Sequence, residues 1–361
     1  MKIVLTGGGT AGHVIPHLAL LEDLKGAFSD IYYIGSKSGI EKVIIENEKI
    51  PYYGITVVKL KRKLSFSNLM IPFKLIKGIS EAKKVLRSLK PDIVFSKGGF
   101  VSVPVVMAAK RLKIPVVLHE SDMTMGLANR ISIRYCKKVL TTFESTAKNI
   151  KKGKGVFTGA PIRPKLYKGS KEKGLKQLNF KEVKPVLLVI GGSSGAVIIN
   201  EILRKNLNSL NSFNVVHITG RGNKLYELES GAYRQIEFFE SIEDIFAAAD
   251  LIVSRAGSNA ITEFLALKKP ALLIPLPKGV SRGDQVLNAG YFEKKGYSLV
   301  LQQACLTGDN FISKINELIR KKQVLIFNMS GAKNTDGTKK IAFEIIQTGI
   351  NSPLNKFAKK R

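Results

Sequence analysis

The sequence has no tryptophan and only two cysteines, Cys136 and Cys305, which lie in different halves of the 361 residues. Two distant cysteines argue against a disulfide framework, and no Cys-x-x-Cys pattern or Cys/His cluster offers a metal site. Both cysteines are therefore expected to be small buried hydrophobic residues. No stretch approaches the roughly 20 uncharged apolar residues of a membrane span, and the N-terminus lacks the apolar segment of a signal peptide. The sequence therefore predicts a protein of the cytoplasm.

Acidic residues are scarce. The chain has 28 Asp and Glu against 58 Lys and Arg, a formal net charge of +30. Such an excess indicates an anionic partner, which can be a nucleic acid, an acidic lipid or a phosphate-bearing substrate. Lysines spread over every solvent-exposed face explain much of it as well, so the charge alone does not decide. With 44% hydrophobic residues, the chain has enough apolar surface for about two domains.

Each half of the sequence alternates short apolar strands with helical patterns. Continuous runs of Val, Ile and Leu predict buried parallel strands at residues 3–6, 31–34, 93–95, 116–119 and 138–142, and again at residues 185–190, 214–219, 251–254, 271–275 and 298–301. This alternation predicts the α/β class, with two Rossmann-like doubly wound domains. A segment rich in Lys, Gly and Pro begins at Pro161, so we predict domains at residues 1–162 and 163–361. A C-terminal helix near residues 339–347 is a candidate to pack back on the first domain.

Two glycine-rich loops follow the first predicted strand of each half, at residues 7–12 and 191–196. The first fits the G-x-G-x-x-G pattern of dinucleotide-binding proteins. The next strand ends in Gly35, Ser36 and Lys37, without the acidic residue that would hold a ribose, so a dehydrogenase is disfavoured. Glycines let backbone N–H groups approach an anion, and we interpret both loops as phosphate-binding turns. The alternative is that each is only a tight strand-to-helix turn.

A set of seven segments carries a more specific pattern, at residues 8–16, 98–104, 119–129, 159–163, 191–196, 255–263 and 284–289. In this order they resemble the MurG family of bacterial peptidoglycan glycosyltransferases, which is glycosyltransferase family 28, over nearly the whole chain. The resemblance implies a GT-B fold with two domains facing across a cleft. It also implies inverting transfer of N-acetylglucosamine from UDP-N-acetylglucosamine to undecaprenyl-diphosphate-linked N-acetylmuramyl-pentapeptide, which converts lipid I to lipid II in peptidoglycan synthesis.

The resemblance further assigns roles in substrate binding. Glu263 would accept hydrogen bonds from the ribose hydroxyls, and Gln285 would bind the sugar hydroxyls. Arg163 and Ser193 would hold the diphosphate. The remaining candidates for substrate binding are Thr10, Ala11, Gly12, Asp122, Phe239, Ser258, Asn259, Ala260 and Asp284. The family usually has Asn at the positions of Asp122 and Ala160 and often Gln at Ser194, differences that affect sugar contacts more than the reaction class.

Displacement at the anomeric carbon needs a base for the acceptor hydroxyl and neutralisation of the departing UDP. The sequence has no Asp-x-Asp motif for a divalent cation, so we predict a metal-independent reaction without a cofactor. His13 is the preferred general base, because an imidazole titrates near neutral pH, and His119 with Glu120 is the alternative. His17 is expected to pack or cap near His13, and His217, inside an apolar strand, to be structural.

Basic and bulky apolar residues interleave between residues 59 and 77. Phe66, Leu69, Phe73 and Lys74 predict contact with an anionic membrane surface, and the alternative is an internal helix with a basic exposed face. The expected partners are UDP-N-acetylglucosamine, lipid I and that surface, with the protein peripheral on the cytoplasmic face of the bacterial inner membrane. Rival functions are sugar transfer to diacylglycerol, epimerisation of UDP-N-acetylglucosamine, and nucleic-acid binding without catalysis. No RNA-recognition or helix-turn-helix signature supports the last.

Overall fold

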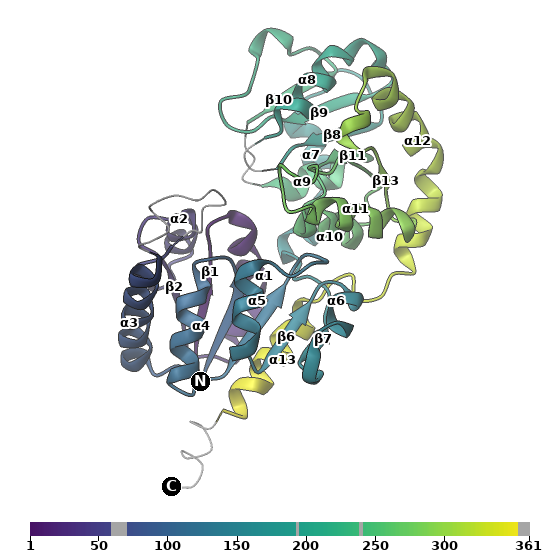
Figure 1. Cartoon of the computed structure of the whole chain (residues 1–361). Helices are drawn as coiled ribbons and strands as arrows, with labels where there is room; N and C mark the ends of the chain where they lie inside the picture. Colours follow the sequence, from purple (N-terminus) through teal and green to yellow (C-terminus); the bar gives the residue numbers. More distant parts are fainter. Residues whose placement is uncertain (59–70, 193–194, 238–240, 353–361) are drawn as a thin grey trace. The chain divides into compact units, whose positions relative to one another are not determined.

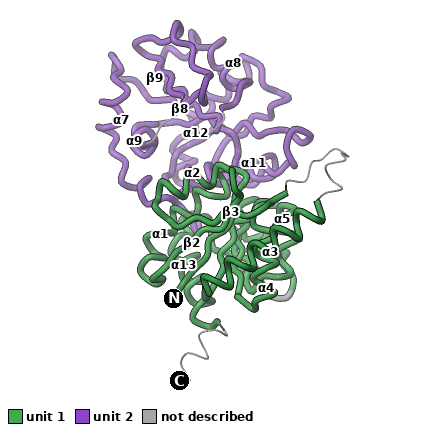
Figure 2. The backbone as a smooth tube through the Cα atoms, turned by 90° about the vertical axis from the view of Figure 1, so that its left-hand side faces the viewer, with its two compact units in different colours: residues 1–161, 336–361 green, residues 162–335 purple. Residues whose placement is uncertain are grey.

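The computed structural model describes residues 1–58, 71–192, 195–237 and 241–352. The chain forms two compact units, which Figure 2 colours separately. Unit 1 comprises Met1–Pro161 and Asp336–Arg361, and unit 2 comprises Ile162–Thr335. The chain returns to unit 1 after Thr335, so the C-terminal helix packs on the first domain as the sequence suggested, although the predicted bounds counted it within residues 163–361. The predicted cleft between the domains stays a prediction.

Unit 1 is built on a seven-stranded parallel sheet in its described part, with the strand order β3-β2-β1-β4-β5-β6-β7 (Figure 1). The strands are β1 (Lys2–Gly7), β2 (Asp30–Ser36), β3 (Tyr52–Ile55), β4 (Ile93–Gly98), β5 (Val116–Glu120), β6 (Lys138–Thr141) and β7 (Gly155–Phe157). The order reverses between β1 and β4, which lie side by side although a long stretch of chain separates them. This is the doubly wound arrangement that the alternation of strands and helices predicts.

Helices cover both faces of this sheet, because alternate strand residues point to opposite sides. In β1, Val4 joins a buried cluster with residues of α3 (Ile71–Leu89) and α4 (Ser102–Arg111). Ile3 and Leu5 join a second cluster with residues of α1 (Ile15–Lys25) and α13 (Thr338–Ile350). The helices of unit 1 are α1 (Ile15–Lys25), α2 (Ile40–Asn47), α3 (Ile71–Leu89), α4 (Ser102–Arg111), α5 (Leu127–Ser132), α6 (Glu144–Lys148) and α13 (Thr338–Ile350).

The C-terminal helix α13 is part of the unit 1 core. Its residues Ile341 and Ile345 are fully buried in the same cluster as Leu20 and Leu24 of α1. Glu344 pairs with Lys138 of β6 on the flank of this contact. Burial of two isoleucine side chains contributes on the order of 3–6 kcal/mol relative to their exposure, so the packing fixes the helix to the first unit.

Unit 2 repeats the architecture with a six-stranded parallel sheet in its described part, in the order β10-β9-β8-β11-β12-β13. Its strands are β8 (Val186–Ile190), β9 (Asn214–Ile218), β10 (Tyr233–Ile236), β11 (Leu251–Ser254), β12 (Ala271–Leu273) and β13 (Leu299–Val300). Its helices are α7 (Lys171–Leu178), α8 (Val197–Lys205), α9 (Ile242–Ala248), α10 (Ser258–Ala266), α11 (Asp284–Lys294) and α12 (Gly308–Ser330). The order reverses between β8 and β11, as it does between β1 and β4 in unit 1.

Every predicted strand is present, and three strands that the sequence did not predict lie at sheet edges. They are β3, β7 and β10. Edge strands have one neighbour and a partly exposed surface, so they lack the continuous aliphatic run that marks a buried parallel strand. The sequences of β3 and β10, Tyr-Tyr-Gly-Ile and Tyr-Arg-Gln-Ile, fit this explanation.

The two cysteines have different environments. Cys136 is buried, and burial raises the pKa of its thiol to about 12. Cys305 is exposed, so the prediction of a buried residue is wrong at this position. It ends the short 3-10 helix η8 (Gln303–Cys305), which follows the edge strand β13 and has no buried residue. The described part of the chain also contains no helix that is both long and apolar enough to cross a membrane.

Candidate active site

Two glycine motifs meet in unit 1, at the carboxyl ends of the neighbouring strands β1 and β4. A Cβ atom on Gly99 would lie 2.3 Å from the carbonyl oxygen of Gly8, and one on Gly9 would lie 2.4 Å from Cε1 of Phe100. Gly9 and Gly99 also have φ values of +85° and +79°, which favour glycine. The first and second motifs of the sequence therefore form one surface, at the point where an open α/β sheet usually binds its ligand.

His13 lies on this surface. It ends the 3-10 helix η1 (Ala11–His13), is partly exposed, and has its Nδ1 atom 3.0 Å from the hydroxyl of Thr10. A Cβ on Gly99 would come within 3.3 Å of the same Nδ1 atom, which places the imidazole against the second glycine motif. The predicted segment of the first glycine loop, Thr10 to His13, therefore lies beside the second glycine motif.

The first glycine loop has an internal carboxylate that sequence reasoning missed. The Gly9 amide donates a hydrogen bond to Oε2 of Glu41 at 3.2 Å, and the Ser36 amide donates to Oε1 at 3.1 Å. Glu41 is fully buried in the first turn of α2. The carboxylate takes the Gly9 amide that the sequence interpretation reserved for a phosphate. The close packing of this carboxylate on Gly39, where a Cβ would lie 2.3 Å from Oε1 of Glu41, is visible only in the structure.

His119 is buried at the carboxyl end of β5, with both ring nitrogens in contact with polar partners. Its Nδ1 atom lies 2.7 Å from Nζ of Lys97, and its Nε2 atom lies 3.0 Å from the carbonyl oxygen of Gly159. Because a carbonyl can only accept, Nε2 carries the proton and Nδ1 accepts from the lysine. Burial, and next the charge of Lys97, lower the pKa of His119 well below its ordinary value. The ring is therefore neutral and enclosed.

Lys97 is the second residue that sequence reasoning missed. Only 2% of it is exposed, and its ammonium group donates to Ser121 Oγ at 2.7 Å in addition to its contact with His119. Burial lowers its pKa to about 7, against the opposing effect of Glu120 and Asp122. The lysine directly precedes the second glycine motif, and this position in the sequence was the available signal.

Glu120 holds the loop between β5 and α5. Its Oε1 atom accepts from the Asp122 amide at 3.0 Å, and its Oε2 atom accepts from the Gly126 amide at 3.1 Å and from Nδ2 of Asn129 at 2.8 Å. Burial first, and then the charge of Asp122, raise its pKa. Glu120 therefore orders the loop that carries Asp122, and its oxygens are engaged in doing so.

The remaining histidines are structural. His17 is buried and packs edge-on against Tyr33 and Phe95, with ring centroids 5.4 and 5.5 Å away, and burial lowers its pKa to about 3. His217 contacts the Tyr233 hydroxyl at 2.8 Å and Oδ1 of Asn200 at 2.9 Å. Burial lowers the pKa of His217 to about 3 as well, so the prediction of a structural residue is confirmed.

Unit 2 has a cavity of about 480 Å³ at the carboxyl ends of β8 and β11. It is lined by residues of three predicted segments, namely the second glycine loop, the start of α10 and the start of α11. The residues of these segments that line it include Gly191, Gly192, Gly195, Gly257, Ala260 and Gln285. Glycine amides and the N-terminus of α10 give the cavity the donors that a phosphate requires.

Two polar side chains shape the wall of this cavity. Arg255 donates to the carbonyl of Ile274 at 3.1 Å and to Oε1 of Gln303 at 2.8 Å, and burial lowers its pKa. Gln285 accepts from the Leu276 amide at 3.0 Å through Oε1. These contacts fix both side chains at the cavity edge.

Two predicted residues that lie far apart in the sequence contact each other in unit 2. Arg163 donates to Glu263 through Nε at 2.9 Å and through a terminal nitrogen at 3.0 Å, a bidentate pair. Neither residue lines the cavity. Each was predicted to contact a substrate group, and in this structure each is the other's partner.

The other candidates divide into described and undescribed residues. Asp284 begins α11, and its Oδ2 atom lies 3.6 Å from a terminal nitrogen of Arg282. Ser258 and Asn259 begin α10. Phe73 and Lys74 are exposed in the first turn of α3. Ser193, Ser194, Phe239, Phe66 and Leu69 lie outside the described residues. In the described part of the chain, no three His, Cys, Asp or Glu side chains form a group that could hold a metal ion.

Known proteins resemble this chain over nearly its whole length. Residues 3–141 match the glycosyltransferase family 28 N-terminal domain, and residues 186–345 match the glycosyltransferase family 28 C-terminal domain. A protein of Clostridium botulinum (strain Kyoto / Type A2) is 53% identical over 94% of this chain and 97% of its own length. A protein of Clostridium tetani (strain Massachusetts / E88) is 49% identical over 94% of this chain and 96% of its own length. Both are named UDP-N-acetylglucosamine--N-acetylmuramyl-(pentapeptide) pyrophosphoryl-undecaprenol N-acetylglucosamine transferase.

Solved structures share the fold. MurG of Acinetobacter baumannii superimposes with a TM-score of 0.74 at 24% identity, over 96% of this chain and 99% of that protein. UDP-GlcNAc 2-epimerase from Neisseria meningitidis superimposes with a TM-score of 0.67 at 16% identity, over 96% of this chain and 100% of that protein. Two Rossmann-like units with parallel sheets and these structural neighbours define the GT-B class. Within that class, the chain belongs to glycosyltransferase family 28.

Proposed function

We propose that this chain transfers N-acetylglucosamine from UDP-N-acetylglucosamine to undecaprenyl-diphosphate-linked N-acetylmuramyl-pentapeptide, as the names of its relatives state for them. The observation that carries the proposal is the unit 2 cavity, which brings together Gly191, Gly192, Gly257 and Gln285 from three separate segments. Its volume of about 480 Å³ lies within the usual range for a small-molecule site. The diphosphate would bind the glycine amides and the start of α10, and Gln285 would bind sugar hydroxyls.

Donor binding requires the pair between Arg163 and Glu263 to exchange partners. Glu263 would turn its carboxylate to the ribose hydroxyls, and Arg163 would turn its guanidinium to the diphosphate. Both changes replace one charge-assisted hydrogen bond by another, so the exchange costs little net free energy. The arginine would then supply positive charge where the UDP leaving group develops negative charge.

We infer that His13 is the general base rather than His119. The ring nitrogens of His119 are held by Lys97 and by the Gly159 carbonyl, and its ring is fully buried. Glu120 is engaged by two amides and Asn129. His13 is partly exposed, and the Thr10 hydroxyl contacts its Nδ1 atom and so orients the ring. Its Nε2 atom would then take the proton of the acceptor hydroxyl.

The base is tested by kinetics of His13→Ala and His13→Gln. Loss of a general base lowers kcat by about 10²–10⁴-fold. Binding of UDP-N-acetylglucosamine, measured by calorimetry, should be unchanged, because the residues proposed to hold its diphosphate, ribose and sugar, Arg163, Glu263 and Gln285, lie in unit 2. Turnover of either variant at the wild-type rate would assign the base to another residue.

The whole proposal is tested with radiolabelled UDP-N-acetylglucosamine and three reactions. We expect sugar transfer with the polyprenyl-linked acceptor, no transfer to diacylglycerol, and no epimerised UDP-sugar without acceptor. Label in diacylglycerol or in the epimer would support one of the two rivals instead. EDTA should leave turnover intact if Arg163, the helix N-terminus and the glycine amides stabilise the leaving group, and loss of activity on chelation would contradict this.

We further propose that the enzyme works at an anionic membrane surface on the cytoplasmic side. Phe73 and Ile76 of α3 are exposed by 67% and 65% beside Lys74 and Lys77, whereas Ile79 and Leu86 of the same helix are buried. An exposed apolar pair next to lysines suits an anionic bilayer. Phe73→Ser with Ile76→Ser should weaken binding to vesicles that contain phosphatidylglycerol. Unchanged binding would exclude this face.

A further inference from the structure

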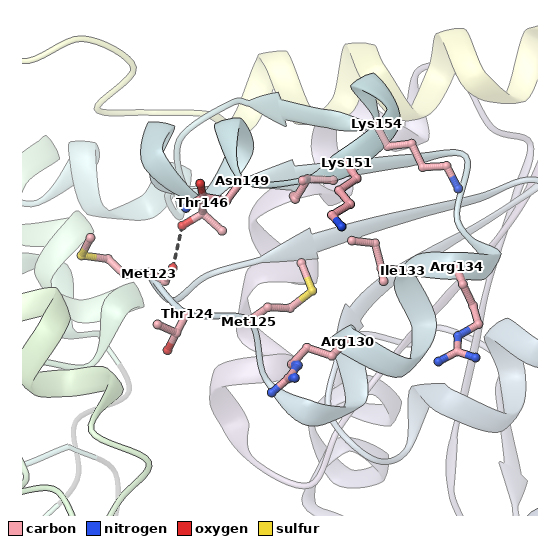
Figure 3. A pocket seen from close by; sticks show the side chains of 11 residues that line it. Met123, Thr124, Met125, Arg130, Ile133, Arg134, Thr146, Asn149, Lys151 and Lys154 are labelled. Atoms are coloured by element: carbon pink, nitrogen blue, oxygen red, sulfur yellow. Dashed lines mark hydrogen bonds between the residues drawn. The ribbon is translucent and has the colours of Figure 1, made fainter.

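A buried glutamate holds each of two loops at the carboxyl edge of the unit 1 sheet. Glu120 holds the loop between β5 and α5, where the hydroxyl of Thr146 in α6 also donates to the carbonyl of Met123 at 2.8 Å (Figure 3). Glu41 holds the first glycine loop, and the proposed reaction gives this residue no task. Because the same loop leads to His13, the contacts of Glu41 bear on the reaction.

Glu41 joins the end of β2 to the first glycine loop. The residue is fully buried, and its Oε1 atom accepts from the Ser36 amide at 3.1 Å and from the Ser36 hydroxyl. Its other oxygen, Oε2, accepts from the Gly9 amide at 3.2 Å. A buried carboxylate that loses a donor is left partly unsatisfied, which is costly. The carboxylate therefore fixes the glycine loop relative to the end of β2.

Three glycines make room for this carboxylate. A Cβ atom would lie 2.6 Å from Cδ of Glu41 at Gly8, 3.0 Å from Cγ at Gly35 and 2.3 Å from Oε1 at Gly39. These glycines belong to three segments, namely the first glycine loop, β2 and the residue before α2. Since a side chain at Gly8 or Gly39 would displace the carboxylate, the surrounding sequence is adapted to Glu41 from several sides.

The contacts continue from Gly9 to His13. Gly9 also packs against the second glycine motif, because a Cβ at this position would lie 2.4 Å from Cε1 of Phe100. Thr10 follows directly, and its carbonyl accepts from the His13 amide at 3.1 Å while its hydroxyl lies 3.0 Å from Nδ1 of His13. A shift of the Gly9 amide therefore moves Thr10 and, with it, the imidazole.

We propose that Glu41 is a positioning residue for sugar transfer, whose carboxylate holds the Gly9 amide and thereby sets the position of His13. This inference rests on the proposed function, in which His13 is the general base. A general base must lie within hydrogen-bond reach of the hydroxyl that it deprotonates. A displacement of about 1 Å can lower a rate about a hundredfold. Glu41 acts through His13 and does not itself contact substrate.

Two variants disturb the carboxylate in different ways. Glu41→Gln keeps the shape of the side chain but replaces one oxygen by an NH₂ group, which cannot accept from the amide of Gly9 or Ser36. Gly39→Ala keeps the charge and the sequence of the glycine loop, but its Cβ would displace the oxygens of Glu41. The backbone of Gly39 has φ −83° and ψ 165°, which alanine adopts without strain, so this variant should fold.

Both variants should lower kcat about tenfold to a hundredfold. The Kd for UDP-N-acetylglucosamine, measured by calorimetry, should stay unchanged, because Arg163, Glu263 and Gln285 lie in unit 2. In a His13→Ala background neither variant should lower kcat further, because a residue that acts through the imidazole has no effect once the imidazole is absent. A general structural role would instead lower kcat by the same factor in both backgrounds.

Glu81→Gln is the matched control. Glu81 of α3 also accepts from a main-chain amide and a hydroxyl, but both belong to Thr56, which follows β3. The same substitution therefore removes the same kind of contact away from the first glycine loop. It should lower the stability in urea unfolding and leave kcat unchanged.

The ring signals of His13 report its position without any need for activity. In NMR spectra of protein with labelled histidine, the His13 signal should shift in Glu41→Gln and Gly39→Ala and stay in place in Glu81→Gln. An unmoved His13 signal, or losses in kcat that multiply with that of His13→Ala, would overturn the proposal alone. Wild-type kcat in His13→Ala would instead refute the base of the proposed function, and this proposal with it.

Discussion

Lys97 makes the stability of unit 1 depend on pH. The residue is 2% exposed, and burial lowers the pKa of its ammonium group from 10.5 to about 7. In the unfolded chain the same lysine keeps its proton up to about pH 10. Between these two pKa values the unfolded state binds more protons than the folded state, so the free energy of unfolding rises with pH in this window. Below about pH 7 both states are charged, and the cost of burying the charge is present in full.

The size of the effect follows from the shift of the pKa. Each pH unit inside the window changes the free energy of unfolding by up to about 1.4 kcal/mol, so the interval from pH 7.5 to 9.5 corresponds to about 2 kcal/mol. Lys97→Met removes the titrating group and keeps most of the side-chain volume. It also leaves Ser121 Oγ and His119 Nδ1 without their lysine partner, a cost that is independent of the lysine's protonation.

Urea unfolding followed by circular dichroism at pH 7.5, 8.5 and 9.5 checks this reasoning. The difference in free energy of unfolding between wild type and Lys97→Met should grow by about 2 kcal/mol in favour of the wild type over this interval. Lys25→Met, at an exposed position on α1, serves as the matched control and should follow the wild type. Parallel profiles for the wild type and Lys97→Met would refute a buried lysine with a depressed pKa.

Three other predictions concern single positions. Glu263→Gln should raise the Kd for UDP-N-acetylglucosamine about tenfold, because the amide is a weaker acceptor for the ribose hydroxyls, and calorimetry measures it. Cys305 should react with a thiol reagent in the native protein while Cys136 reacts only after unfolding, as their exposure requires, and reaction of both would contradict it. Gly99→Ala should destabilise the protein by about 2–4 kcal/mol in urea unfolding, since its Cβ would lie 2.3 Å from the Gly8 oxygen at a φ of +79°, and a loss under about 1 kcal/mol would refute the close contact.

Much of the fold could be predicted because it depends on local composition. The runs of Val, Ile and Leu in β1, β4 and β8 are buried by helices on both faces, and this burial is what produces the runs. The edge strands β3, β7 and β10 escaped prediction because one side of each lacks a neighbour. The exposure of Cys305 was not predicted for a related reason. Cysteine is usually a buried residue type, but this preference does not indicate whether a short helix that follows an edge strand is buried.

The candidate site was predicted as a set of segments rather than as a geometry. The sequence indicated that His13, Arg163, Glu263 and Gln285 matter, through the resemblance to a family. It gave no means of seeing that Arg163 and Glu263 bond to each other across 100 residues. It also left His13 and His119 as alternative general bases. The two differ mainly in the hydrogen-bond partners of their ring nitrogens.

By itself, then, the amino-acid sequence determined the alternation of strands and helices, the two repeats of that alternation, and the glycines at the ends of β1, β4 and β8. These features follow from burial and from backbone conformation, which neighbouring residues specify. Only the tertiary structure decided that β1 lies beside β4, that Glu41 takes the Gly9 amide, and that Lys97 contacts His119. Such contacts depend on strand order and on side-chain direction, because residues distant in the chain meet only when the sheet is assembled.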